Sequence, residues 1–188
     1  TQMVNTKDIL ETINMIREEN LDIRTITMGI SLYDCVSEDE DRLCEKIYDK
    51  ITRSAENLVV TGQNIEKKYG IPIVNKRVSV TPIALIGGKA DSDGYVKIAT
   101  TLDRAAKTLG INFIGGFSAL VQKGMSRGSE QLIKAIPQAL TETDFLCSSL
   151  NVASTKAGIN MDAIYMAGNA IKEMAYLTKD KNSSGCAK

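Results

Sequence analysis

Histidine is absent from this sequence of 188 residues, and its absence excludes several classes of chemistry. Serine hydrolases with a Ser-His-Asp triad and cysteine hydrolases with a Cys-His pair both need an imidazole as general base. Zinc sites with imidazole ligands are excluded for the same reason. A general base must therefore be a carboxylate, lysine, cysteine or tyrosine with a shifted pKa, unless a partner chain supplies a histidine. The carboxylates that do cluster, at residues 39–41 and at Asp91 and Asp93, lie in predicted first turns of helices and not inside the protein, so we predict no metal site.

Aromatic residues are scarce as well, and the sequence has neither an excess of basic residues nor a long apolar run. Only 5% of residues are aromatic while 43% are hydrophobic, so the core must be built mainly from aliphatic side chains. The 23 Lys and Arg residues balance 23 Asp and Glu residues, whereas nucleic-acid-binding proteins usually carry a basic excess. No apolar run reaches the roughly 18 residues of a bilayer-spanning helix, and no charged-then-apolar leader is present. We therefore predict no nucleic-acid partner and no membrane association.

The cysteines are too widely spaced for any C-x-x-C pair; they are Cys35, Cys44, Cys147 and Cys186. In a chain of this length without a leader, such cysteines are typical of reduced thiols in the cytosol. We therefore predict a cytoplasmic protein.

The hydrophobic pattern alternates between helical and strand periodicity along the chain. The predicted strands are residues 21–32, 71–80, 111–114 and 145–152. Helices are predicted at 9–16, from a capping box at 37–40 to Gly70, from Thr81-Pro82, from Asp93-Gly94 to Gly110, in short pieces at 118–122 and 129–136, and after Asn160. This alternation predicts a parallel sheet with helical crossovers, in a single α/β domain over residues 1–188.

The polar end of the chain, residues 179–188, forms no recognisable closing element. Two interpretations remain open. The chain is the N-terminal portion of a longer protein, or its last residues are a frayed tail.

A first candidate site is the polar run in the second predicted strand, which contains Asn75, Lys76 and Arg77. Two adjacent cations inside a strand are costly to bury without partners. One interpretation is an edge strand with solvated charges. The other is a clamp for an anion, in which the arginine grips a carboxylate or phosphate with two parallel hydrogen bonds.

A second candidate site follows the third predicted strand, at Gly115, Gly116 and Ser118. Paired glycines that lead into a helix free backbone N–H groups for an anion, although a tight turn gives the same pattern. The next stretch, residues 123–129, is basic and punctuated by glycines, which fits either a mobile loop or an ordinary surface connection.

A third candidate site is the fourth predicted strand and the segment after it, with Cys147, Ser148, Ser149, Asn151 and Lys156. Buried polar side chains must find partners, so this run predicts a polar, ligand-lined interior. Cys147 is a candidate nucleophile, and its alternative role is as a small buried hydrophobe. Lys156 is the better candidate for a ligand contact, because hydroxyl residues and a glycine flank it.

Four long stretches resemble a family of unknown function found widely in bacteria and archaea, labelled "PFL-like" and also known as the domain of unknown function seven hundred and eleven. The stretches lie in order at residues 22–32, 70–82, 112–124 and 154–161, and the resemblance covers nearly the whole chain. It implies an α/β barrel like those of pyruvate formate-lyase and ribonucleotide reductase, in which two parallel half-sheets of five strands enclose a central site. Members of the family are much longer than this chain, so the resemblance implies about the N-terminal half of a ten-stranded barrel.

The resemblance brings no activity with it. Glycyl-radical enzymes carry a C-terminal glycine motif and a cysteine on a loop inside the barrel. This sequence has no such glycine motif, and Cys147 lies in a predicted strand.

These features predict a cytosolic enzyme, or enzyme half, that binds a small anionic metabolite at the strand-end mouth of the barrel. The expected partners are the missing C-terminal half or another chain, with a homo-oligomer as the expected assembly, and no cofactor is identified. The alternatives are a non-catalytic regulatory protein that binds a metabolite, and a purely structural domain.

Overall fold

The protein is described by a computed structural model over residues 5–19 and 21–188, in which four parallel strands alternate with helices. The strands are hydrogen-bonded in chain order: β1 (Ile23–Ile30), β2 (Ile73–Val80), β3 (Phe113–Leu120) and β4 (Leu146–Asn151). The helices are α1 (Thr6–Arg17), α2 (Glu40–Ala55), α3 (Leu58–Tyr69), α4 (Ser92–Leu109), α5 (Arg127–Glu142) and α6 (Met161–Leu177). The predicted α/β fold with a parallel sheet is therefore confirmed.

Shorter elements connect these strands and helices. Four 3₁₀ turns are η1 (Tyr33–Cys35), η2 (Ile83–Leu85), η3 (Lys179–Lys181) and η4 (Ser184–Ala187). A small antiparallel ribbon of β5 (Ala153–Ser154) and β6 (Gly158–Ile159) lies between β4 and α6. The sequence pattern did not predict this ribbon.

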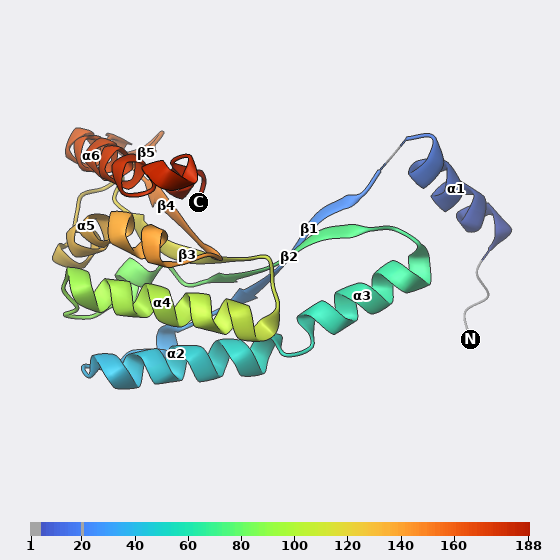
Figure 1. Cartoon of the computed structure of the whole chain (residues 1–188), viewed down its shortest axis with the longest axis horizontal. Helices are drawn as coiled ribbons and strands as arrows, with labels where there is room; N and C mark the ends of the chain where they lie inside the picture. Colours follow the sequence, from blue (N-terminus) through green and yellow to red (C-terminus); the bar gives the residue numbers. More distant parts are fainter. Residues whose placement is uncertain (1–4, 20) are drawn as a thin grey trace.

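Helices α2, α4, α5 and α6 lie side by side as one layer (Figure 1). Strand order explains this arrangement. Crossovers between parallel strands are almost always right-handed, so strands that add to a sheet in one direction place their helices on one face. At the other end of the molecule, β1 and β2 extend away from this layer together with α3 and α1 (Figure 1).

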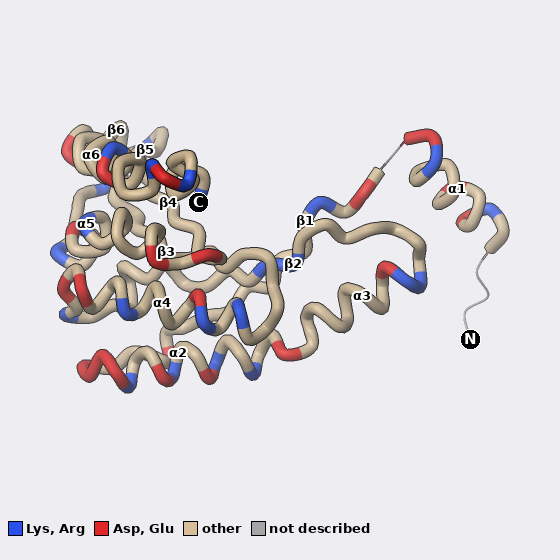
Figure 2. Tube along the Cα trace, viewed as in Figure 1, with Lys and Arg blue, Asp and Glu red and all other residues tan. Residues whose placement is uncertain are grey.

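The core lies between the helical layer and one face of the sheet. Its fully buried residues are mostly aliphatic, as the composition predicts, and include Leu43 and Ile47 of α2 and Ile98 of α4. An aromatic pair completes it: the rings of Tyr95 and Phe117 meet edge to face at 6.5 Å between centroids. Lys, Arg, Asp and Glu residues are interspersed along α2 and α4, whereas most of the strand trace is uncharged (Figure 2).

The predicted helix from the capping box at 37–40 to Gly70 is two helices. The N-terminal cap of α2 is Asp39, whose Oδ1 accepts the Arg42 N–H at 2.8 Å, so the predicted capping box at 37–40, in which Ser37 would be the cap, is wrong. Separate helices let α2 pack on α4 while α3 follows the extended part of β2. The prediction of Gly70 as a left-handed C-terminal cap is confirmed by its φ of 69°.

The helix predicted from Thr81-Pro82 is replaced by the short turn η2. The Thr81 hydroxyl accepts the Leu32 N–H at 3.0 Å, which ties the ends of β1 and β2 together instead of capping a helix. Helix α4 begins at Ser92 with Asp91 as its cap, so Gly94 lies in its first turn and not before it.

The short helix predicted at 118–122 is also wrong, because β3 continues to Leu120. Its pairing with β4, with Ser118 opposite Ser149, overrides the local glycine signal. The predicted piece at 129–136 is part of the longer helix α5.

The polar tail is packed against the body and is not frayed. Gly185 is buried within η4, and the Lys188 amino group donates to the carbonyl of Leu140 at 3.1 Å and to that of Thr143.

Candidate functional site

The second face of the sheet carries several small polar residues and glycines where a covered face would carry apolar ones. Along β2, Val78 and Val80 are buried against the helices while Ser79 between them is exposed. Thr27 and Gly29 of β1 are likewise exposed. We call this side of the sheet the open face. All-parallel sheets are almost always covered on both faces, so an uncovered polar face is unusual.

Strand register places most of the predicted site residues on the open face. Residues paired across parallel strands point to the same side, and successive residues alternate between sides. The pairs Thr25–Asn75, Thr27–Arg77, Ser79–Gly115, Gly115–Cys147, Ser118–Ser149 and Leu120–Asn151 therefore share one face. The structure thus brings together, from all three predicted clusters, Asn75, Arg77, Gly115, Ser118, Cys147, Ser149 and Asn151.

Lys76 does not join Arg77 in a clamp. It lies on the other side of the strand, where its amino group pairs with both carboxylate oxygens of Glu66 in α3 at 3.2 Å and donates to the Ile73 carbonyl at 2.8 Å. The pKa of the Glu66 carboxyl is lowered, first by the Ile73 N–H bonded to it and then by Lys76. The alternation of a strand separates two adjacent cations, and β2 is flanked by β1 and β3, so it is not an edge strand.

Gly116 is a packing residue and does not present N–H groups at a helix start. It lies at a register shift in the β3–β4 pairing, between Gly115 and Phe117, with a φ of 121°. A Cβ at Gly116 would lie 2.7 Å from the Val80 carbonyl oxygen, so a side chain there would collide with β2. Gly115, in contrast, faces open space: a Cβ there would meet nothing within 4 Å.

Some serine and asparagine side chains of the sheet already form hydrogen bonds within the protein, and others are exposed. Ser148 points toward the helical side and donates to the Phe117 carbonyl at 2.8 Å. Ser118 is buried and bonds to the Gly116 carbonyl at 3.3 Å, and Asn75 donates to the Arg24 carbonyl at 3.1 Å. Ser149 and Asn151 are exposed.

Cys147 is half-buried on the open face, and its electrostatic surroundings oppose a thiolate. Burial raises the pKa of the Cys147 thiol, while the positive charge of Arg77 acts in the opposite, lowering direction. A nucleophilic cysteine usually has a depressed pKa. Burial therefore disfavours the thiolate that a nucleophilic role of Cys147 would need.

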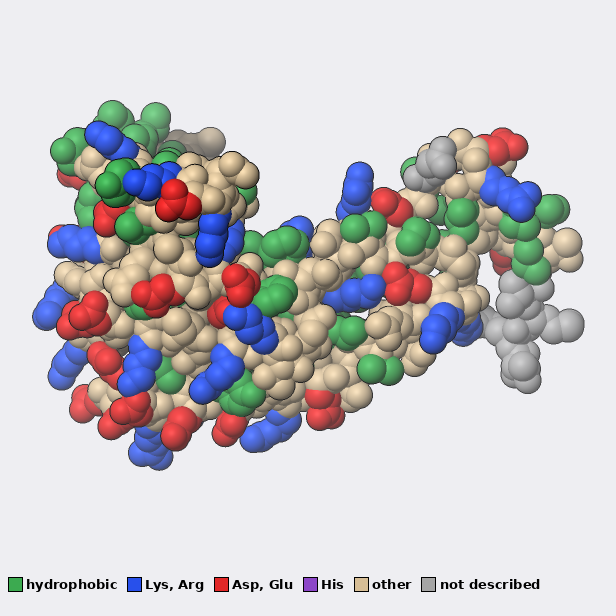
Figure 3. Space-filling model, viewed as in Figure 1, with side chains coloured by type: hydrophobic (Ala, Val, Ile, Leu, Met, Phe, Trp, Pro, Cys, Tyr) green, Lys and Arg blue, Asp and Glu red, His purple; other side chains and the backbone are tan. Residues whose placement is uncertain are grey.

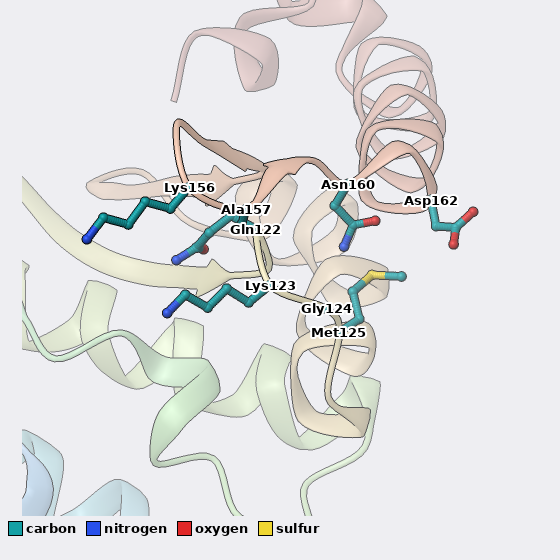
Figure 4. A pocket seen from close by; sticks show the side chains of 8 residues that line it. All are labelled: Gln122, Lys123, Gly124, Met125, Lys156, Ala157, Asn160 and Asp162. Atoms are coloured by element: carbon teal, nitrogen blue, oxygen red, sulfur yellow. The ribbon is translucent and has the colours of Figure 1, made fainter.

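A cavity of about 740 Å³ lies beyond the carboxyl end of β3, between the loop after β3 and the β5–β6 ribbon. We call it the loop pocket. Its lining is Gln122, Lys123, Gly124, Met125, Lys156, Ala157, Asn160 and Asp162. Lys123, Lys156 and Gln122 extend in one direction, whereas Asp162 points to the other side (Figure 4). Ligands of parallel α/β sheets bind at this end of the strands.

The two lysines of the loop pocket carry uncompensated positive charge. Neither Lys123 nor Lys156 forms an ion pair with any residue in the described part of the chain. The buried Oε1 of Gln122 has no hydrogen-bond donor there either. The pocket therefore offers two cationic donors to a ligand.

Asn160 holds the loop pocket together. Its Nδ2 donates to the Val121 carbonyl at 2.7 Å, and its Oδ1 accepts the Ala163 N–H at 3.1 Å, which confirms its prediction as the cap of α6. One side chain thus fixes the loop after β3 to the start of α6.

Sequence reasoning named Lys156 as a site residue but missed Gln122 and Lys123. The basic, glycine-punctuated stretch at 123–129 was the available signal, because it joins a strand end to a helix start. What the pattern could not show was that the β5–β6 ribbon brings Lys156 to the same pocket.

A second cavity, of about 460 Å³ and largely apolar, lies between β4, α5 and α6. Exposed hydrophobic side chains continue from it along α6, including Ile171 at 55% and Tyr176 at 68% exposure. In the space-filling view, hydrophobic side chains gather at the upper left, where Figure 1 labels α6 (Figure 3).

Residues 5–19 and 21–188 contain no group of three or more Cys, Asp or Glu residues that could hold a metal ion. No helix there has both the length and the apolar character needed to cross a membrane.

Comparison with known proteins gives one consistent family. A family model described as "Uncharacterised ACR (DUF711)" matches residues 14–188. The chain is 61% identical over 186 residues to a UPF0210 protein of Ruminiclostridium cellulolyticum, and 62% identical over 185 residues to one of Clostridium botulinum. A UPF0210 protein of Agathobacter rectalis is 60% identical over 188 residues.

These alignments cover 98–99% of this chain but 41% of each relative, so the chain spans well under half the length of the proteins it matches. The family model and the relatives agree with the resemblance noted from the sequence. The chain belongs to the DUF711 (UPF0210) family.

Proposed function

We propose that this chain is the N-terminal portion of a ten-stranded α/β barrel, and that the protein is a cytosolic enzyme that binds a small anionic metabolite in the loop pocket. The observation that carries the ligand class is the pair Lys123 and Lys156, which reach one cavity from separate loops without an acidic partner among the described residues. Both lysines are exposed at the pocket, and a ligand that brings negative charge can form charge-assisted hydrogen bonds with their amino groups.

The barrel architecture is supported by the sheet itself. Its open face is polar, its strands add in one direction, and β1 and β4 each have a strand neighbour on one side only within the described residues. Further strands at these edges would curve the sheet around its polar face and complete the cover that parallel sheets need. The greater length of the relatives leaves room for such strands.

The cytosolic location is supported by the free state of all four cysteines, because no disulfide links Cys35, Cys44, Cys147 or Cys186.

Completion of the barrel by a second chain in a homo-oligomer is the alternative to a longer single chain. The intact mass of the native gene product separates them: a mass of 20.4 kDa would require two chains to build the barrel together.

The ligand proposal is tested by thermal-shift screening of the native gene product against di- and tricarboxylates, phosphate esters and inorganic phosphate. We expect at least one anion to raise Tm. Lys123→Gln and Lys156→Gln should each weaken binding by 10- to 100-fold, since a hydrogen bond to a charged group contributes about 1.5–3 kcal/mol. Lys172→Gln, the same change on the exposed surface of α6, is the matched control and should bind normally.

Two outcomes would contradict the ligand proposal. One is that no anion raises Tm. The other is that the Lys123 and Lys156 variants keep the affinity of the control. Tm without ligand should be unchanged in all three variants, because each lysine is exposed.

A non-catalytic regulatory protein is the second candidate function, and the state of the site residues favours it. The carboxylate that lines the loop pocket, Asp162, points away from the lysines, and the Cys147 thiol has a raised pKa. Incubating any stabilising anion with the protein separates the two functions. Consumption of the anion identifies an enzyme, and its quantitative recovery identifies a binding protein.

A further inference from the structure

Arg77 is a cation on the open face whose charge has no partner within residues 5–19 and 21–188. Its Nε is buried and receives no hydrogen-bond acceptor there, and no carboxylate pairs with its guanidinium. The guanidinium instead lies over the ring of Phe113, 5.1 Å from its centroid. A cation–π contact orients a guanidinium but leaves its charge uncompensated.

The next row of the sheet beside Arg77 lacks side-chain bulk. Register aligns Gly29, Ser79, Gly115 and Cys147 across all four strands. A Cβ built on Gly29 or on Gly115 would meet nothing within 4 Å, and neither glycine has a left-handed backbone that would exclude a side chain. Glycine inside a strand weakens the strand, and it often marks a place where a ligand or another backbone approaches the strand closely.

We infer that the open face is a carboxylate-binding site, in which the Arg77 guanidinium grips the carboxylate of a ligand that lies over the Gly29–Ser79–Gly115 row. A guanidinium fork matches a planar carboxylate with two parallel hydrogen bonds. The charges match as well, because one guanidinium balances one carboxylate but leaves a phosphate dianion half neutralised. The Ser79 hydroxyl is exposed in the same row and supplies a further donor.

This site differs from the loop pocket in its residues, its strand positions and its ligand contacts. Arg77 lies mid-strand, whereas Lys123 and Lys156 lie on loops beyond the strand ends. The inference therefore goes beyond the proposed function, and variants of different residues test the two.

Cys147 provides a chemical reporter for the test. It pairs with Gly115 as the β4 residue of the same row, and the positive charge of Arg77 acts on its thiol. Iodoacetate and iodoacetamide alkylate a thiolate by the same displacement of iodide, but only iodoacetate carries a carboxylate. The measured quantity is the ratio of the two alkylation rates at Cys147, divided by the same ratio at exposed Cys186 in the native gene product.

We expect this normalised ratio to be about tenfold above one, because a bound carboxylate places the reagent beside the thiol. Arg77→Gln should lower it to about one. Arg77→Lys should give an intermediate value, since lysine keeps the charge but not the fork. Arg24→Gln on β1 is the matched control, since its side chain is 82% exposed, and should leave the ratio unchanged.

Gly115→Ala tests the glycine row without disturbing the fold. The added methyl group meets open space in the protein but occupies the path of the ligand, so the ratio should fall several-fold while Tm is retained. Gly168→Ala, at a glycine of α6 that also has nothing within 4 Å of its Cβ, should not change the ratio.

Three results would overturn the inference. A normalised ratio near one in the unmodified protein would mean that no carboxylate is held there. A normalised ratio in the Arg77→Lys variant equal to that of the unmodified protein would mean that a positive charge alone, and not the guanidinium fork, attracts iodoacetate. A Cys147 that neither reagent alkylates would mean that the open face is closed to small molecules. A normal ratio in Lys156→Gln, together with lost anion binding in the loop pocket, would show that the two sites are independent.

Discussion

Asp103 of α4 holds the start of β4 in place, and its replacement gives the sharpest stability prediction. The residue is 4% exposed, and its Oδ1 accepts the N–H groups of Asp144 at 2.9 Å and of Phe145 at 2.7 Å. Its Oδ2 pairs with Lys107 at 3.0 Å. Asp103→Ala removes the acceptor and leaves two backbone donors without a partner, at about 1–3 kcal/mol each. We therefore expect a loss of about 3–5 kcal/mol in the free energy of unfolding.

Two variants separate the backbone hydrogen bonds of Asp103 from its ion pair. Asp103→Asn keeps an acceptor oxygen for both N–H groups and should cost about 1–2 kcal/mol. Lys107→Gln breaks the ion pairs of a half-exposed lysine with Asp103 and Asp144 but keeps both backbone hydrogen bonds of Asp103, so it should change the free energy of unfolding far less than Asp103→Ala. Urea unfolding at neutral pH, followed by circular dichroism, measures all three changes. If Asp103→Asn were as destabilising as Asp103→Ala, the charge and not the backbone bonding would dominate, and our reasoning would be refuted.

Three other measurements follow from particular contacts. Gly116→Ala should lower the free energy of unfolding by about 3 kcal/mol through backbone strain and collision with β2, while Gly115→Ala should change it by less than about 1 kcal/mol; equal effects in urea unfolding would contradict the assignment of the bulge. A backbone N–H and a lysine, both of β2, lower the pKa of Glu66 below its ordinary value of 4.5, so its contribution to stability is present above that value and is lost as pH falls through the lowered pKa. Glu66→Gln should therefore flatten the acid side of the stability profile, and an unchanged profile would refute this. In a thiol titration of the native protein, exposed Cys186 should react at once, whereas Cys44, which is 6% exposed and whose pKa is raised by burial, should react only on unfolding.

Local signals in the sequence were reliable where one residue decides the outcome. Gly70 and Gly110 both end helices in the left-handed conformation, and the Asn160 side chain caps α6. Each depends on backbone geometry or hydrogen bonding within a few residues, which the sequence encodes directly.

Local signals failed where a partner strand competes with them. Residues 118–122 follow a glycine pair and resemble a helix start, yet pairing with β4 keeps Ser118 in a strand. Thr81-Pro82 resembles a helix cap, yet the Thr81 hydroxyl bonds to the Leu32 N–H of a segment 49 residues earlier. Neither interaction is visible in a short window of sequence.

The candidate site shows the same division. The sequence singled out the polar strand residues, and Arg77, Gly115 and Cys147 do share one face of the sheet. It could not show that Lys76 pairs with Glu66 of α3, or that Lys123 and Lys156 line one pocket.

The sequence by itself determined the alternation of strands and helices, the aliphatic core, the lack of any histidine among these 188 residues and the family. These follow from composition, periodicity and extended similarity, which need no knowledge of distant contacts. Only the tertiary structure decided which polar residues meet. A strand sends adjacent side chains to opposite faces, and its register with its neighbours fixes which of them lie together, so Arg77 joins the open face while Lys76 is taken up by a helix.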